Sequence, residues 1–101
     1  MFATYPNSQV RPAQMKLSPE GRCFSHAEAC RMFSQALSQA ARRVVIDLGL
    51  VDDATTSAFA QLVLLRRSLL RSGRDLCLTG LHDRPASVFQ VNRLDGVLPL
   101  V

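Results

Sequence analysis

A nearly unbroken apolar run at positions 44–48, Val-Val-Ile-Asp-Leu, constrains the fold of this chain more than any other segment. Successive β-branched residues favour an extended strand, and the lack of alternation predicts a strand that is covered on both faces. Gly49 ends the run, and Thr55 and Thr56 then precede a helical pattern. A buried strand that leads into a helix is typical of a parallel α/β sheet.

Two longer helices are predicted from capping residues and from apolar spacing of three and four. Ser25 followed by Glu28 is a capping-box pattern and predicts a helix from about 26 to 41. A second helix should begin near Thr55 or Thr56, end near Ser72 and be capped by Gly73. The expected buried stripes are Cys30, Phe33, Leu37 and Ala40 in the first helix, and Ala58, Leu62, Leu65 and Leu69, with Phe59, Val63 and Leu70 beside them, in the second.

The remaining elements complete an alternating pattern. Segments 9–17 and 22–24 flank a Ser-Pro-Glu-Gly turn and are expected to form a hairpin. Segment 75–79 predicts another strand, Pro85 lies in the first turn of a third helix with Asp83 as its cap, and 97–98 predicts a last strand. The predicted fold is α/β with the order β-β-α-β-α-β-α-β and a mixed sheet of four to five strands. Residues 1–8 are expected to be a flexible tail, and 9–101 a single domain.

Composition narrows the class of protein. The chain has 101 residues, 48% of them hydrophobic, and neither a membrane-length apolar run nor a signal-peptide pattern, so we expect a cytoplasmic protein without membrane insertion. The net charge is +4, but the arginines are dispersed without interleaved aromatic residues, which argues against nucleic-acid binding. Cys23, Cys30 and Cys77 are expected to be reduced and buried. His26 and Cys30 lack the further ligands of a zinc site, so neither a metal nor a cofactor is predicted.

The order of these motifs resembles a STAS domain, the fold of bacterial anti-sigma factor antagonists. The similarity rests on the strand 44–48, on the segment 55–62 (Thr-Thr-Ser-Ala-Phe-Ala-Gln-Leu) in place of the family's Asp-Ser-Ser-Gly-Leu-x-x-Leu pattern, on the arginine-rich helix end and glycine turn of 66–80, and on the ending 92–99. The resemblance implies a STAS-like domain that binds proteins. The chain departs from the family pattern at Thr55, where most phosphorylated members have Asp, and at Ala58, where they have Gly. It also lacks their usual carboxyl-terminal helix.

The resemblance also implies a site. Thr56 occupies the family's phospho-acceptor position, so Thr56 and Ser57 are the candidates for phosphorylation. The predicted partner-binding residues are Asp52, Asp53, Thr55, Thr56, Ser57 and Phe59. Three alternatives stay open: the hydroxyl residues could only cap the helix, the two aspartates could be plain solvated charges, and Phe59 could belong to the core. No catalytic motif or carboxylate dyad is present, so an enzyme is not expected.

The predicted function is therefore that of a regulatory binding module. The first candidate partner is a switch-protein kinase that acts as an anti-sigma factor. The alternative is a STAS subunit of a lipid-transport ABC system, which would bind the ATPase of that system. The sequence leaves the identity of the partner and the oligomeric state open.

Overall fold

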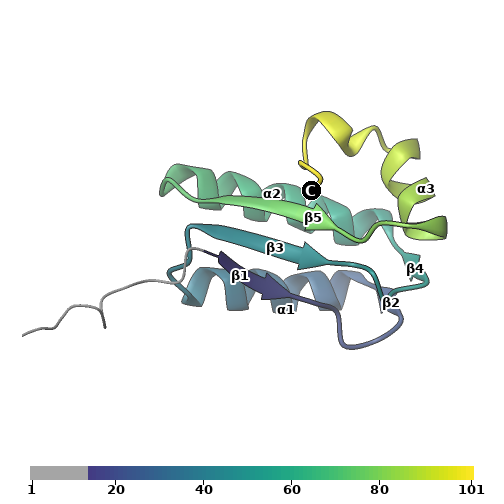
Figure 1. The fold of residues 1–101 in the computed structure, drawn as a ribbon, viewed down its shortest axis with the longest axis horizontal. Helices are drawn as coiled ribbons and strands as arrows, with labels where there is room; N and C mark the ends of the chain where they lie inside the picture. The colour runs from purple at the N-terminus through teal and green to yellow at the C-terminus, as the bar shows by residue number, and fades with distance from the viewer. Residues whose placement is uncertain (1–13) are drawn as a thin grey trace, which may run out of the picture.

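Two parallel sheets and three helices make up residues 14–101, which the computed structural model describes (Figure 1). The larger sheet has the order β1-β3-β5, formed by β1 (Gln14–Leu17), β3 (Arg43–Asp47) and β5 (Asp75–Thr79). A two-stranded sheet joins β2 (Cys23–Phe24) to β4 (Asp53–Ala54). The predicted tail and the first five residues of the predicted first strand, 9–13, lie outside the described residues.

The strand pairing differs from the prediction in three respects. Every ladder within residues 14–101 is parallel, so the expected mixed sheet is wrong. The expected hairpin is also wrong, because Phe24 pairs with Ala54 of β4, and its carbonyl accepts a bond of 3.1 Å from the Thr55 amide. In place of a strand at 97–98 there is a 3₁₀ turn, Leu94–Gly96, followed by a single parallel bridge between Leu78 and Leu100.

The helices begin where their caps predict, with one exception. Helix α1 (His26–Ser38) follows Ser25, whose hydroxyl accepts from the Glu28 amide at 3.2 Å, although the helix ends three residues earlier than expected. Helix α2 (Thr56–Arg71) confirms the second prediction, and Gly73 follows it at φ 74°. Helix α3 (Asp83–Val91) is preceded by His82 as its cap residue, so the predicted cap, Asp83, lies inside the helix.

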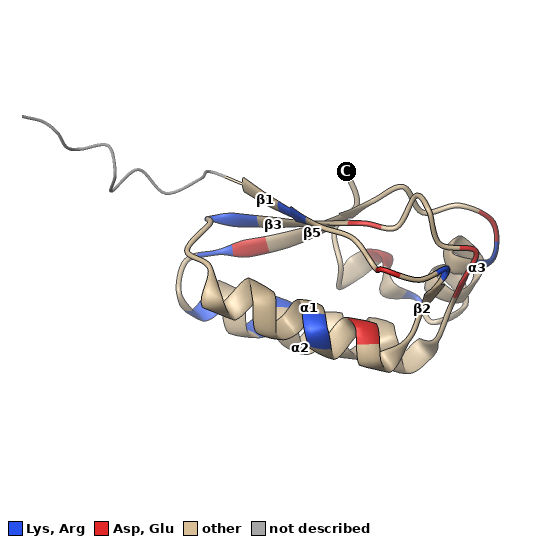
Figure 2. Cartoon of the chain, turned by 90° about the horizontal axis from the view of Figure 1, so that it is seen from below, with Lys and Arg blue, Asp and Glu red and all other residues tan. Residues whose placement is uncertain are grey.

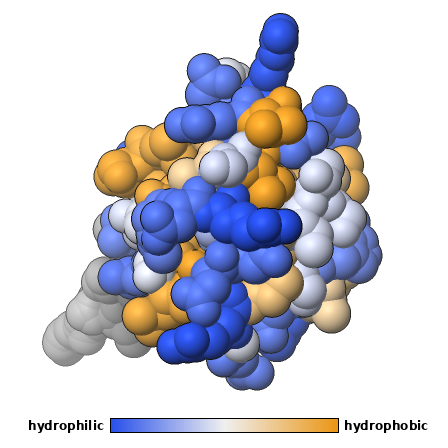
Figure 3. Space-filling model, turned by 90° about the vertical axis from the view of Figure 1, so that its right-hand side faces the viewer, coloured by the Kyte–Doolittle hydropathy of each residue, from blue (hydrophilic) through white to orange (hydrophobic). Residues whose placement is uncertain are grey.

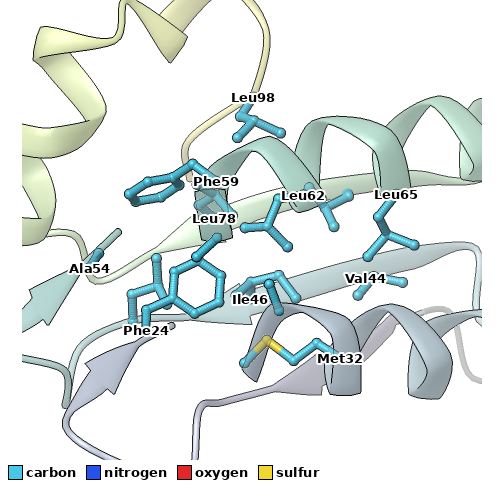
Figure 4. Packing of buried hydrophobic residues seen from close by; sticks show 14 of the residues in the cluster. Phe24, Met32, Val44, Ile46, Ala54, Phe59, Leu62, Leu65, Leu78 and Leu98 are labelled. Atoms are coloured by element: carbon cyan, nitrogen blue, oxygen red, sulfur yellow. The ribbon is translucent and has the colours of Figure 1, made fainter. Parts of the chain in front are cut away.

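Helices α1 and α2 form one layer against a single face of the larger sheet (Figure 2). No helix within residues 14–101 covers the opposite face, although the expected burial of β3 on both faces is confirmed for its three middle residues. Val45 and Cys77 lie on this second face and are nevertheless only 7% and 6% exposed. Alternation along β3 directs Val44 and Ile46 into the core beneath the helices (Figure 4).

Three phenylalanines join the parts of the core near the carboxyl ends of the strands. Phe59 of α2 lies edge-on to Phe24 of β2 at 5.5 Å between ring centroids, and edge-on to Phe89 of α3 at 5.8 Å. Figure 4 shows Phe24 and Phe59 between the strands and helices. Edge-to-face pairs of this kind add to the free energy gained from burial. Through these aromatic contacts, α3 and the two-stranded sheet both pack against α2.

The buried face of α1 is shifted by one position from the prediction. Its buried residues are Ala29, Met32 and Ala36, whereas Cys30 is exposed and Leu37 is 50% exposed. Small alanines let a helix lie close to its neighbours, so this face fits against α2 despite its lower hydrophobicity. The expected burial of the cysteines is correct for Cys77 and wrong for Cys23 and Cys30.

Gly80 is required by a close approach between the chain segments that follow β3 and β5. It has φ 77°, and a Cβ built there would lie 2.7 Å from the Gly49 amide nitrogen. We expect Gly80→Ala to lower the free energy of unfolding by about 2 kcal/mol or more, because backbone strain and a backbone clash add together. Urea denaturation measures the change. Gly21→Ala is the matched control, since a Cβ at Gly21 has no atom within 4 Å. Equal stability of the two variants would contradict this account.

Candidate functional site

The amino-terminal end of α2 confirms that the hydroxyl residues open a helix after the central strand. Thr55 is extended, with φ −107° and ψ 152°, and its Oγ1 accepts from the Ala58 amide at 3.1 Å. Thr56 and Ser57, the first residues of the helix, are both exposed. The amides of a first turn have no partner inside the helix, and the helix dipole places partial positive charge there. The site can therefore receive an anion or an acceptor group.

Asn92 holds the Thr56 side chain in place. Its Nδ2 donates to Thr56 Oγ1 at 3.2 Å and to the carbonyl of Val88 at 2.8 Å. Asn92 follows the end of α3, so the contact joins the start of one helix to the end of the next. Sequence reasoning missed this residue, because the two positions are 36 apart and only the packing of α3 against α2 brings them together.

Two surface hollows meet at Thr56 and Asn92, which line both of them. One, of about 440 Å³, extends along α3 and includes Arg84 and Val91. The other, of about 370 Å³, extends along α2 and includes Leu64 and Arg67. Figure 3 shows this end of the molecule, where hydrophobic patches alternate with hydrophilic surface. The Thr56 hydroxyl is thus flanked by one arginine and some apolar surface on each side.

The two predicted aspartates lie beside this region but line neither hollow. Asp52 is exposed and forms an ion pair with Arg22 at 3.2 Å. Asp53 accepts from Arg84 Nε at 2.9 Å and from the Ala54 amide at 2.8 Å. Asp53 therefore positions Arg84, while Asp52 remains at the rim.

Phe59 does not belong to the surface, so its prediction as a partner-binding residue is wrong. Its side chain is 0% exposed and packs between Phe24 and Phe89. The alternative that Phe59 is a core residue is correct. In the second stripe of α2 only Phe59 is buried, since Val63 is half-buried and Leu70 is 48% exposed.

His82 connects the loop after β3 to the start of α3. Its Nδ1 lies 2.8 Å from an Asp83 carboxylate oxygen, and its Nε2 lies 3.0 Å from the Gly49 carbonyl oxygen. The hydrogen bond to Asp83, followed by the bond to the Gly49 carbonyl, raises the pKa of His82 above its usual value of about 6.5. When the ring is protonated, both of its nitrogens carry a proton, so Nδ1 can donate to Asp83 and Nε2 can donate to the Gly49 carbonyl.

His82 should therefore make stability depend on pH. Its folded pKa is raised, so its contribution is fully present below the unfolded pKa and disappears as pH rises through the folded pKa. We expect wild-type unfolding midpoints in urea to fall from pH 6 to pH 8 and His82→Gln to flatten that fall. His26→Gln is the control, because the one side-chain hydrogen bond of His26 among the described residues is with Cys30. An unchanged slope in His82→Gln would refute the assignment.

The hydroxyl of Thr55 acts as a cap, which a carboxylate can replace. We expect Thr55→Ala to lower the free energy of unfolding by about 1 kcal/mol, since the Ala58 amide loses its side-chain acceptor and keeps only the Thr55 carbonyl. Thr55→Asp should retain the wild-type stability or exceed it, because Asp also caps and its charge suits the helix dipole. Chemical denaturation compares the two variants. A loss in Thr55→Asp as large as in Thr55→Ala would show that capping is not the role.

Neither a metal site nor a membrane span is found in the part of the chain that the structure describes. Within residues 14–101, no three His, Cys, Asp or Glu side chains are grouped so that they could hold a metal ion. No helix there combines the length and the hydropathy needed to cross a bilayer.

Comparisons with known proteins agree with this architecture. A family model described as "Mlab, STAS domain" matches residues 11–101. The NMR structure of the protein TM1081 is similar with a TM-score of 0.71, covering 91% of this chain and 76% of that chain at 16% sequence identity, which shows a shared fold. No curated protein matches the chain. The chain belongs to the STAS domain family.

Proposed function

We propose that this chain is a non-catalytic module that binds a protein partner through the start of α2. One observation carries the proposal: Thr56 is exposed at the first residue of the helix, where two hollows meet. The proposed contact residues are Asp52, Asp53, Thr55, Thr56 and Ser57. Exposed free thiols at Cys23 and Cys30 suit a reducing compartment, in keeping with action in the cytoplasm.

The surface around Thr56 has the composition of a protein-binding site. Leu64 is 47% exposed on one side, and Val91 is 80% exposed on the other. Apolar side chains next to arginine and to a fixed hydrogen-bonding group are typical of the centre of a protein interface. Asn92 donates to Thr56 Oγ1, so the hydroxyl proton of Thr56 stays available to a partner.

Phosphorylation of Thr56 would change this surface without disturbing the fold. A phosphate adds a charge of about −1.5 to −2 and three acceptor oxygens. Arg67 and Arg84 line the two adjacent hollows, and the positive end of the α2 dipole lies at Thr56. A docked partner would meet this charge directly, so the modification would act as a switch on binding. Ser57 is the second candidate, with its Oγ 3.3 Å from Thr55 Oγ1.

Two classes of partner fit this proposal. The first is a switch-protein kinase that acts as an anti-sigma factor, which the family resemblance of segment 55–62 supports. The second is the ATPase of a lipid-transport ABC system, to which this chain would attach as a STAS subunit. The second candidate is favoured by the matching family model, whose description names Mlab. Both partners are ATPases and would dock on the same surface.

A charge placed at Thr56 should abolish docking. We expect affinity-tagged wild-type protein to recover one ATPase from lysate of its native host, identified by mass spectrometry, and Thr56→Glu to recover at least about tenfold less. The reason is that a carboxylate must be desolvated inside the interface. Ser34→Glu is the matched control, since it adds the same charge at an exposed position in α1.

The identity of the captured ATPase separates the two candidates. A histidine-kinase-like protein supports the first, and a transporter ATPase supports the second. Phosphate on Thr56 or Ser57, mapped after incubation with that protein and ATP, would support the switch. Equal recovery by Thr56→Glu and wild type, with no phosphate on residues 55–57, would overturn both the site and the switch.

A further inference from the structure

Unpaired positive charge is concentrated at the end of the molecule opposite Thr56. β3 and β5 begin there and α2 ends there, and Figure 2 shows basic residues in blue, here arginines, at this end of the sheet and helices. Four arginines define this basic end: Arg42, Arg43, Arg71 and Arg74. Among the described residues none of the four has an ion pair, whereas Lys16, Arg22, Arg31, Arg66 and Arg84 each have at least one.

The basic end is shaped as well as charged. Two hollows of about 580 and 630 Å³ adjoin each other there and share Arg42, Gly73 and Arg74. Arg74 is fixed, because its guanidinium donates to the carbonyls of Ala41 at 2.6 Å and Ala36 at 2.9 Å. Leu70, 48% exposed, adds an apolar wall to one hollow.

One acidic residue, Asp75, lines these hollows, and its charge is already compensated. Burial raises the pKa of this carboxyl, but the hydrogen bonds from Arg66 and from the Leu76 amide outweigh burial and leave the pKa below its usual range. Arg66 Nε lies 2.8 Å from Asp75 Oδ1. The electrostatic potential at the basic end is therefore positive and is determined by the four arginines.

We propose that the basic end is a second docking surface, which binds a carboxylate-rich segment of a protein partner that also carries apolar side chains. The carboxylates would pair with Arg42 and Arg43 in the hollows and with Arg71 at the adjacent end of α2, and an apolar side chain would lie against Leu70. This surface is separate from the one around Thr56, so the inference does not depend on the function proposed for that site.

Three other occupants fit the observations less well. The chain's own segment 1–13 contains Arg11 and no Asp or Glu, so it offers no complementary charge. Among residues 14–101 a second copy would offer one side-chain carboxylate that has no ion pair, Asp95, and a single carboxylate does not match four arginines. Nucleic acid is less suitable because no aromatic side chain lines either hollow to stack on a base.

The test is fluorescence anisotropy of a labelled peptide of about twelve residues, built from Glu-Glu-Leu repeats, titrated with the full chain at about 50 mM salt. We expect wild-type protein to bind and the affinity to fall as salt rises. Arg42→Gln and Arg71→Gln should each weaken binding about threefold, and the double variant about tenfold, as for exposed ion pairs. Arg93→Gln is the matched control, since it removes an unpaired, exposed arginine that lies outside the basic end.

The outcomes distinguish binding at the basic end from a general effect of net charge and from binding of nucleic acid. Wild-type affinity in Arg93→Gln, together with the losses above, would support the proposal. No binding of the peptide, or an equal loss in Arg93→Gln, would overturn it. Tighter binding of duplex DNA than of the peptide, weakened by the same two variants, would replace the protein partner with nucleic acid.

Discussion

Parallel pairing of β3 with both β1 and β5 is the constraint on which the rest of the structure depends. Because the strands run in one direction, each connection must return along the sheet, and α1 and α2 do so on the same face. Val44 and Ile46 are then sealed beneath both helices. Burial of these side chains and the direction of the helices follow from one arrangement.

The same arrangement gives the molecule two chemically different ends. The helices begin at the carboxyl ends of the strands, where free amides and partial positive charge surround Thr56. Helices α1 and α2 finish at the other end, where Arg74 donates to the carbonyls of Ala36 in the last turn of α1 and of Ala41 beyond it, and Arg71 ends α2. A cation suits this negative end of a helix, which favours Arg71 in the last turn of α2. The two proposed surfaces are thus consequences of strand direction.

The sequence was sufficient to predict the local parts of the fold and of the site. The strand 44–48, the start of α2 and the glycine after it depend on propensity and capping within a few residues, and these predictions are confirmed. The family was also predicted, from the order of such segments.

Features that depend on distant partners could not be predicted. The contact of Asn92 with Thr56 requires the packing of α3 on α2, and the hairpin failed because β2 finds its partner thirty residues later in β4. The buried face of α1 was predicted from hydrophobicity, whereas close packing selected Ala29 and Ala36 over Cys30 and Leu37. The arginines of the basic end come from separate segments of the sequence and become neighbours only when β3 and β5 pair. Tertiary geometry decides each of these features.

The bridge between Leu78 and Leu100 also protects the larger sheet. Leu78 donates to the Pro99 carbonyl at 2.9 Å and accepts from the Val101 amide at 2.8 Å, so the last residues occupy the outer edge of β5. An open strand edge can recruit the same strand of another molecule and start aggregation. Residues 99–101 therefore occupy the edge at which another molecule could pair with β5, and substitutions in this segment that break its two hydrogen bonds to Leu78 would expose that edge.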